Sequence, residues 1–506
     1  MNIVHTLLES TKKAPNHSAI VYKNETKTYS ELTQQMLQLA GGFKRVGIKK
    51  GAHVGMMISN RPEYIITYYA LLAVGATVIP INPLFKRDEL TYILINSDAE
   101  ALIFDTNSIK TVQNAMNELE NVKTFIYLGE NQSADMLSWQ DLSKDEPLKE
   151  IAELDSEDLA QIIYTSGTTG RPKGAMITQG NINWMSKTCL AMSNLTPNDR
   201  ILLVLPLYHA YAKLQGMVAP FRIGATVYLE ERFYPDEILT MIAEEKITNF
   251  MGVPTMYAMF VNSPKITEYD YSSLKYCGSG GASLPLEIME KVNKLMGVEV
   301  MEGYGQTEST VMISRTRKDG ERRPGSVGLP IPGIELKIVD TEGNEVTSDN
   351  IGEIIFRGPN AMKGYYKKPE ETSQTIKNGW VYTGDLGRID DQGHIYIVDR
   401  RKEMIIRGGF NVYPREVEEV LYTHKAVVEC AVIGEADPIF GEEIAAFIVT
   451  KEAIDKDSII SFCKEHLVHY KVPRNIYFID ELPKNATGKI MKNAIKMMSK
   501  LSVENS

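Results

Sequence analysis

Tyr164-Thr-Ser-Gly-Thr-Thr-Gly-Arg-Pro-Lys-Gly174 is the most informative segment of the sequence, and it follows the mostly apolar run Leu159–Ile163. It places three glycines, four Ser or Thr hydroxyls and one lysine within eleven residues. Glycines let backbone N–H groups approach phosphate oxygens, hydroxyls donate further hydrogen bonds, and Lys173 adds a positive charge. The stretch is therefore predicted to be a loop that binds a polyphosphate.

This loop differs from the common nucleotide-binding P-loop. The pattern G-x-x-x-x-G-K-[ST] does not fit residues Gly167–Gly174, so the two loops imply different folds. Taken alone, a stretch rich in Gly, Ser and Thr is also compatible with a flexible turn that binds nothing. The remainder of the chain has to decide between these interpretations.

Length and composition describe an ordinary folded protein. A chain of 506 residues exceeds the size at which one hydrophobic core stops growing, so we expect two or more domains. Apolar residues make up 43% and charged residues 24%, so a core can form. A net charge of -10 argues against nucleic-acid binding, which needs a concentrated basic surface. The four cysteines lie far apart and predict neither a disulfide framework nor a zinc site.

No segment predicts export or a membrane span. Residues Met1 to Ser18 carry charged side chains among the apolar ones and lack the apolar run of a signal peptide. The most apolar region, Tyr64–Ile81, is interrupted by Gly75 and Pro80, so it predicts a buried helix followed by a strand. We expect a cytoplasmic protein.

Helical patterns alternate with short β-rich runs through about the first 390 residues, which predicts α/β layers. Between Gly325 and Val398, short strands separated by Gly and Asp turns predict a small β-rich subdomain. The charged segment Arg400–Glu403 precedes a new run of helix and strands, so we place a domain boundary there. The predicted elements are helices at Ser30–Val46, Pro62–Leu72 and Pro414–Tyr422 and strands at Ala101–Phe104, Thr124–Leu128, Ile201–Leu205, Thr226–Leu229, Glu335–Val339, Gly352–Arg357, His394–Val398, Val427–Ile433 and Glu443–Val449.

Further segments rich in Gly, aromatic and charged residues follow the phosphate loop in order. They are Leu205-Pro-Leu-Tyr-His-Ala-Tyr211, Gly278–Pro285, Glu302-Gly-Tyr-Gly-Gln-Thr-Glu308, Tyr382-Thr-Gly-Asp-Leu-Gly387, Asp399–Glu418 and Pro483-Lys-Asn-Ala-Thr-Gly-Lys489. With these segments, which extend over nearly the whole chain, the sequence resembles the adenylate-forming (AMP-binding) superfamily of acyl-CoA synthetases, peptide-synthetase adenylation domains and beetle luciferases. Within it, the chain resembles bacterial fatty-acid–CoA ligases.

The resemblance implies a fold and a reaction. The α/β fold would comprise a large N-terminal domain of stacked α/β subdomains plus a small β-barrel subdomain, and a small mobile α+β C-terminal domain. Residues 1–399 would bind AMP and activate the acid, residues 400–402 would form a hinge, and residues 403–506 would carry the catalytic lysine. The implied enzyme is an ATP-dependent acid–CoA ligase, which forms acyl-CoA, AMP and diphosphate through an enzyme-bound acyl-adenylate.

Site roles also follow from the resemblance. Glu308, with Thr165, would bind Mg²⁺, for which a carboxylate is a suitable hard oxygen donor. Asp385 would accept hydrogen bonds from both ribose hydroxyls, as an acceptor-only carboxylate can, with Arg400 as a second contact. The expected ATP- or AMP-binding residues are Thr165, Ser166, Gly167, Thr168, Thr169, Gly170, Lys173, Gly281, Ala282, Gly303, Tyr304, Gly305, Gln306, Thr307, Asp385, Arg400 and Lys489.

Four residues are expected to be catalytic by the same resemblance, namely Lys489, Glu308, Thr169 and His209. The Lys489 ammonium would reach the α-phosphate and the substrate carboxylate as charge builds on phosphorus. Its removal would cost about 10²–10³-fold in the adenylation step, as for other preorganised electrostatic contacts. A solvated lysine near a basic C-terminus is the alternative interpretation.

Two chemical steps must share one site, since the carboxylate first attacks phosphorus and a thiol then attacks the acyl carbonyl. The resemblance implies that the C-terminal domain rotates about hinge residue Lys402 between the steps. Rotation would remove Lys489 and bring Gly408 and Gly409 toward the pantetheine of coenzyme A, where small residues let a thin chain pass.

The acid pocket is expected to include His209, Lys213, Met256 and Gly281. The resemblance makes a medium- or long-chain fatty acid the first choice. Lys213, in an otherwise apolar stretch, offers an alternative, because it would pair with a second carboxylate and favour a dicarboxylic acid. A lysine that extends to the surface is the third interpretation.

The sequence is also compatible with a different acyl acceptor, or with no reaction at all. An acyl-AMP ligase or adenylation enzyme would load a carrier protein instead of free CoA, and a non-catalytic relative would only bind nucleotide or acyl chain. The lysines at 489, 492, 496 and 500 stand among Ile and Met, which is compatible with peripheral contact with an anionic membrane or with a solvated terminal helix. A homodimer is likewise compatible with the sequence.

Overall fold

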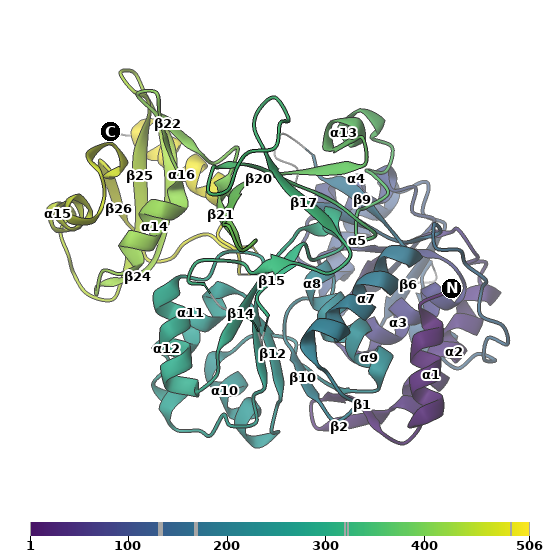
Figure 1. Ribbon diagram of the computed structural model, residues 1–506. Helices are drawn as coiled ribbons and strands as arrows, with labels where there is room; N and C mark the ends of the chain where they lie inside the picture. Colours follow the sequence, from purple (N-terminus) through teal and green to yellow (C-terminus); the bar gives the residue numbers. More distant parts are fainter. Residues whose placement is uncertain are drawn as a thin grey trace.

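The protein combines helices and sheets in layers. The computed structural model describes residues 2–129, 135–165, 171–317, 320, 323–485 and 488–504. Helices cover the faces of two sheets in the larger part of the molecule, and a smaller lobe formed by the C-terminal residues stands to one side (Figure 1). The predicted α/β fold class is confirmed.

One sheet has seven strands within the described residues, in the order β7-β6-β5-β3-β4-β8-β9. Its neighbours pair in parallel except β8 and β9, which form an antiparallel hairpin. The strands are β3 (His53–Met57), β4 (Thr77–Pro80), β5 (Ala101–Asp105), β6 (Thr124–Leu128), β7 (Leu137–Ser138), β8 (Leu159–Thr165) and β9 (Lys173–Thr178).

A second sheet, of nine strands in the described residues, has the order β16-β15-β14-β13-β12-β10-β11-β1-β2. Its centre is parallel and its ends are antiparallel. The strands are β1 (Ser18–Tyr22), β2 (Glu25–Thr28), β10 (Arg200–Leu203), β11 (Thr226–Leu229), β12 (Asn249–Gly252), β13 (Tyr276–Ser279), β14 (Val300–Tyr304), β15 (Ser314–Arg315) and β16 (Leu329–Pro330).

Helices connect these strands. Those of the larger part are α1 (Val4–Lys13), α2 (Tyr29–Arg45), α3 (Pro62–Ala73), α4 (Arg87–Asn96), α5 (Ile109–Ala115), α6 (Trp139–Leu142), α7 (Gln179–Ser193), α8 (Ala210–Lys213), α9 (Ala219–Ile223), α10 (Pro235–Glu244), α11 (Pro254–Asn262), α12 (Leu286–Met296) and α13 (Pro369–Thr375). Short helices are η1 (Thr106–Ser108), η2 (Met116–Glu118), η3 (Leu214–Val218, a π-helix), η4 (Pro264–Thr267) and η5 (Thr307–Ser309).

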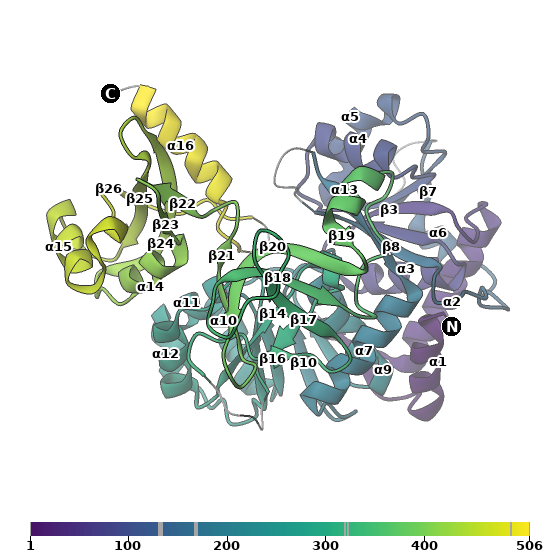
Figure 2. The same cartoon turned by 45° about the horizontal axis from the view of Figure 1, so that its top comes forward.

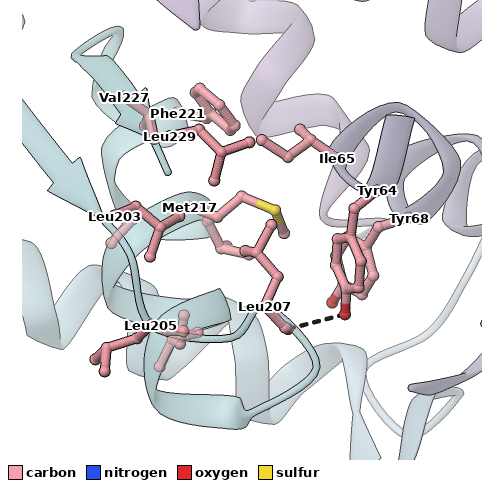
Figure 3. Packing of buried hydrophobic residues seen from close by; sticks show 14 of the residues in the cluster. Tyr64, Ile65, Tyr68, Leu203, Leu205, Leu207, Met217, Phe221, Val227 and Leu229 are labelled. Carbon is pink, nitrogen blue, oxygen red and sulfur yellow. Dashed lines mark hydrogen bonds between the residues drawn. The ribbon is translucent and has the colours of Figure 1, made fainter. Parts of the chain in front are cut away.

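The main core positions the segment that carries His209. Side chains of α3 pack against apolar residues of β10, β11 and the segment after β10 (Figure 3). Tyr64 is fully buried, and its hydroxyl donates a hydrogen bond of 2.8 Å to the backbone carbonyl of Leu207 (Figure 3). Because this bond and the surrounding packing are buried, the chain two residues before His209 is held firmly against α3.

The β-rich region after residue 325 forms an antiparallel sheet of β17 (Glu335–Val339), β18 (Gly352–Arg357), β19 (Ile376–Lys377), β20 (Trp380–Ile389) and β21 (Ile395–Arg400). The strands predicted at 335–339 and 352–357 are confirmed. β21 leads out of this sheet toward the C-terminal lobe (Figure 2).

The C-terminal lobe has its own sheet and its own apolar clusters. Both clusters consist of residues between Ile405 and Ile495. The domain boundary predicted at residues 400–402 stays a prediction, which these separate clusters support. The elements are β22 (Ile405–Arg407), β23 (Phe410–Val412), α14 (Pro414–Tyr422), β24 (Val427–Asp437), β25 (Gly441–Thr450), α15 (Lys456–His466), η6 (His469–Lys471), β26 (Asn475–Phe478) and α16 (Lys492–Glu504).

None of the helices in the described residues is both long and apolar enough to pass through a lipid bilayer. The apolar region Tyr64–Ile81 forms most of α3 and then β4, as predicted.

Candidate active site

The predicted phosphate loop connects the two strands of a hairpin. β8 and β9 pair up to Thr165 opposite Lys173, so the ends of the connecting segment are held together. Tyr164 secures the base of the hairpin by donating from its hydroxyl to Asn96 Oδ1 at 2.7 Å. Five predicted binding residues lie outside the described residues, namely Ser166, Gly167, Thr168, Thr169 and Gly170.

Short contacts connect this hairpin to Glu308. The Lys173 ammonium lies 5.1 Å from the centre of the Tyr365 ring, and the Tyr365 hydroxyl donates to Glu308 Oε1 at 2.8 Å. Glu308 is buried in η5, and its backbone carbonyl accepts from the Met362 N–H at 2.9 Å. The carboxylate is therefore fixed beside the hairpin, and one carboxylate completed by phosphate and water oxygens suits Mg²⁺.

Two neighbouring parallel strands present the glycine-rich motifs. β13 ends at Ser279, just before Gly281 and Ala282, and β14 carries Gly303 and ends at Tyr304. The carboxyl ends of parallel strands meet at one edge of a sheet, where ligands commonly bind. Gly305 is required there, because a Cβ atom would lie 2.1 Å from a backbone oxygen of Val311. Gln306 and Thr307 follow directly, at the start of η5.

Asp385 is the buried centre of a polar cluster. Its Oδ2 accepts from the Tyr304 hydroxyl at 2.7 Å, and its Oδ1 lies 3.0 Å from Arg400 Nε. The pairing of β20 with β21 places Asp385 opposite Arg400, so the register of the sheet positions the ion pair. The Asp385 carboxylate raises the pKa of Arg400, whereas burial, followed by this carboxylate, raises the pKa of Tyr304. A fixed anionic acceptor of this kind can hold hydroxyl donors.

Lys489 lies in the neighbourhood of this cluster although it comes from the C-terminal lobe. The preceding Gly488 has φ +79°, and a Cβ atom there would lie 2.6 Å from Thr255 Oγ1. The lysine is exposed to solvent, although neighbouring protein groups partly desolvate its ammonium. Desolvation and then the positive charge of Arg400 lower the pKa of Lys489. The structure thus brings Asp385, Arg400 and Lys489 to one region, whereas Ala486 and Thr487 lie outside the described residues.

The predicted acid-pocket residues occupy different environments. Burial, followed by the nearby charge of Lys213, lowers the pKa of His209 to about 4. Lys213 is 2% exposed, so the interpretation that it extends to the surface is wrong. Met256 is part of the main apolar core, whereas Gly281 is exposed after β13 with φ +83°.

Glu302 gives a stability prediction. Its buried carboxyl accepts from the Leu284 N–H at 2.9 Å, and burial raises its pKa from 4.5 to about 7. Because the folded-state pKa is the higher one, stability falls as pH rises between these two values. Glu302→Gln keeps the acceptor and removes the titration. We expect its melting temperature, relative to wild type, to increase from pH 5 to pH 8 in fluorimetric melts.

The control for this prediction is Glu290→Gln, which changes an exposed carboxylate of α12. Its melting temperature should differ from wild type by the same small amount at every pH. A Glu302→Gln difference that does not depend on pH would contradict the prediction.

The predicted hinge lies in a turn between β21 and β22. Lys402 is exposed in this turn. A hydrogen bond connects the elements on the two sides of this turn: the Arg415 guanidinium of α14 donates to the Ile397 carbonyl of β21 at 2.6 Å. Gly408 and Gly409 form the tight end of the β22–β23 hairpin, with φ of +56° and +85°. A Cβ atom at Gly408 would lie 3.2 Å from the Phe440 ring of the same lobe.

Sequence reasoning missed Tyr365 and Arg415. Tyr365 lies 57 residues from the Glu308 carboxylate that it bonds, so no local spacing reveals the pair. Its place in Gly364-Tyr365-Tyr366 was the available signal, since aromatic residues beside a glycine often pack under a loop. Arg415 stands within the Asp399–Glu418 segment, yet nothing in the sequence shows that its guanidinium reaches back across the hinge.

Comparison with known proteins identifies the family. The AMP-binding enzyme family matches residues 7–366, and the AMP-binding enzyme C-terminal domain matches residues 416–489. The chain belongs to the AMP-binding enzyme family. The predicted superfamily is thereby confirmed.

Several relatives of this AMP-binding enzyme are named as CoA ligases. It is 35% identical to a long-chain-fatty-acid–CoA ligase of Bacillus subtilis (strain 168), over 97% of this chain and 93% of the relative. It is also 35% identical to a feruloyl-CoA synthase of Amycolatopsis sp, over 96% of each chain. The solved anthranilate CoA ligase in complex with anthranoyl-AMP superimposes with a TM-score of 0.95 at 30% identity, covering 100% of this chain and 98% of that one. This AMP-binding enzyme is an AMP-forming acyl-CoA synthetase.

Proposed function

We propose that the residues gathered around Asp385 carry out acid activation and that CoA then receives the acyl group. In the first step an acid carboxylate oxygen forms a bond to the α-phosphorus of ATP, and diphosphate leaves. In the second step the CoA sulfur forms a bond to the acyl carbon, AMP leaves, and the thiol proton is released. The observation that carries the proposal is the position of Lys489, a residue of the C-terminal lobe that lies close enough to Arg400 and Asp385 for their charges to act on its ammonium.

The proposed roles use the contacts described above. Asp385 and Arg400 hold the ribose hydroxyls, and Tyr304 lies against the adenine while donating to Asp385. The residues from Thr165 to Lys173 bind the phosphates. This range includes residues 166–170, which lie outside the described residues. Glu308, with Thr165, holds Mg²⁺, which neutralises phosphate charge when bound. His209, at the start of α8, lies at the carboxylate end of the acid pocket.

We expect Tyr365→Phe to lower kcat of adenylation about tenfold, because a hydrogen bond to a charged group contributes about 1.5 kcal/mol or more. The variant loses the donor that orients Glu308. The Mg²⁺ concentration that gives half-maximal rate should rise as well, measured by diphosphate release. Tyr366→Phe is the matched control, since that hydroxyl donates to Asp98 instead. Equal effects of the two variants would exclude a special role for Tyr365.

The C-terminal lobe supplies the proposed change between the steps. Rotation about Lys402 would withdraw Lys489 and bring Gly408 and Gly409 toward the pantetheine of CoA. The turn at residues 401–403 supports this proposal, because it joins two lobes with separate apolar clusters. A cytoplasmic location also belongs to the proposal, since ATP and CoA are its co-substrates.

Two classes of acid are candidates. A medium- or long-chain fatty acid is supported by similarity to the Bacillus subtilis ligase. An acid with a second carboxylate is supported by the burial of Lys213 beside His209. The names of relatives do not choose between them, because these names also include feruloyl and anthranilate.

The test supplies ATP, Mg²⁺, CoA and a panel of fatty, aromatic and dicarboxylic acids, and follows AMP and thioester by mass spectrometry. AMP together with acyl-CoA supports the proposal and identifies the acid. Acyl-adenylate that accumulates with CoA unconsumed would instead indicate a carrier-protein loader. Formation of no AMP from any acid would indicate a non-catalytic relative.

A further inference from the structure

A buried amine without a partner lies close to the proposed carboxylate site. Lys213 ends α8, and its Nζ is enclosed yet makes no hydrogen bond to any described residue. The ammonium lies over the face of the Tyr68 ring, 5.2 Å from the ring centre. No carboxylate among the described residues forms an ion pair with it. A buried lysine normally has a charged or hydrogen-bonding partner, and Lys213 lacks one among the described residues.

Two more polar atoms in the same place also lack partners. Lys213 lines a cavity together with Tyr68 of α3 and Gln161 of β8. The Tyr68 hydroxyl and Gln161 Oε1 are buried without hydrogen bonds, like the Lys213 ammonium. Unsatisfied buried polar atoms are rare in native proteins, and here three of them, from three elements, share one cavity. Two of the three can donate to an acceptor group.

The backbone around this cavity is irregular on two sides. Residues Leu214–Val218, directly after Lys213, form a π-helix, a conformation that is frequent at functional sites. Thr310 and Val311, which also line the cavity, have φ of +48° and +94°. Such values are strained for β-branched residues, and strain of this kind clusters at ligand sites.

The cavity adjoins the proposed reaction site. Its lining includes Ala210, the residue after His209, and Thr310, the second residue after Glu308. The Lys213 N–H donates to the His209 carbonyl at 3.1 Å, so the two side chains start about one helical turn, or roughly 5–6 Å, apart. A group on a short acid whose carboxylate lies at His209 can therefore reach Lys213.

The size of the cavity limits that group. Its volume of about 10 Å³ is near the minimum for one water molecule. One polar atom of an entering group, such as a carboxylate oxygen, fits this space in place of a water molecule, whereas a long alkyl chain does not. An alkyl chain would also leave all three polar atoms without partners.

We propose that Lys213, assisted by the Tyr68 hydroxyl, binds a second carboxylate of the acid, so that the preferred substrate is a short dicarboxylic acid. This inference rests on the proposed acid–CoA ligase function and specifies its substrate. Lys213 is a specificity-determining residue that does not touch the reacting carboxylate, so its loss changes the choice of acid more than the chemistry.

The experiment compares dicarboxylic acids of three to eight carbons with monocarboxylic acids of the same lengths. The measured quantity is kcat/KM from AMP release with ATP, Mg²⁺ and CoA. Wild type should prefer the dicarboxylic acid of the best length. Lys213→Met should lower that kcat/KM by about 10²-fold and raise activity on the matched monocarboxylic acid, since an unpaired buried carboxylate is then rejected.

Two further variants keep the result interpretable. Tyr68→Phe removes one oxygen from the core, and it should reduce the dicarboxylate preference by about threefold to tenfold even if Lys213→Met folds poorly. Lys187→Met changes an exposed lysine on the neighbouring α7 and should leave the preference unchanged.

Each outcome has a defined meaning. A wild-type preference for monocarboxylic over dicarboxylic acids of the same lengths, unaltered in Lys213→Met and Tyr68→Phe, overturns the inference and leaves the ligase function in place. If the wild type has a normal melting curve but forms AMP from neither series and from none of the longer fatty and aromatic acids, the ligase function is overturned, and this inference with it.

Discussion

Lys489→Ala lowers the rate of acyl-adenylate formation by about 10²–10³-fold, which is the effect expected for a preorganised charge that stabilises a phosphoryl transition state. Desolvation and then the charge of Arg400 lower the pKa of this lysine, whereas the charges of Glu403 and Asp385 raise it. The transfer of the acyl group from supplied acyl-adenylate to CoA should fall less than threefold, because the proposed second step takes place with Lys489 withdrawn.

The two half-reactions can be measured separately. Diphosphate release reports the first, and thioester formation from synthetic acyl-adenylate reports the second. Lys464→Ala, at an exposed lysine on α15 of the same lobe, is the control and should retain both rates. An equal loss of both half-reactions in Lys489→Ala would argue against a role confined to the first step.

Asp385→Asn should lower kcat/KM for ATP by about 10²-fold. The substitution keeps the shape but removes the charge that pairs with Arg400 and accepts from Tyr304. Removing one member of a buried charge pair costs about 2–5 kcal/mol, and the lower part of this range applies here because Arg400 is partly exposed. Most of the effect should appear in KM for ATP and little in KM for CoA.

Steady-state kinetics with each substrate varied in turn provide the measurement. Asp391→Asn makes the same chemical change six residues away, in an exposed turn, and should leave both KM values as in wild type. If Asp385→Asn raised KM for CoA instead, the cluster would belong to the thiol site rather than to the nucleotide site.

Local patterns predicted many elements with correct bounds. Gly352–Arg357 and Pro414–Tyr422 begin and end as predicted, because turn residues and a proline mark their limits. β10 ends at Leu203, two residues before the predicted end, since the chain turns away toward the Tyr64 contact. The sequence could not supply that contact, which depends on the packing of α3.

Part of the site was predictable and part was not. Motif resemblance named Asp385 and Arg400, and the register of β20 with β21 brings them together. The burial of Lys213 could not be predicted from the sequence, because an isolated lysine in an apolar helix usually reaches solvent. Its burial follows from the packing of α3, α7 and β8 around α8, which becomes visible only in the tertiary structure.

Residues 405–495 bury their apolar side chains against one another, and no residue of the larger part belongs to their two clusters within the described chain. A gene segment that encodes such a unit can recombine between relatives without opening either core. Under the proposed roles, the part that selects the acid and the part that delivers Lys489 can therefore be inherited separately. New acid preferences would arise through changes before the hinge, while the unit that carries the lysine is passed on intact.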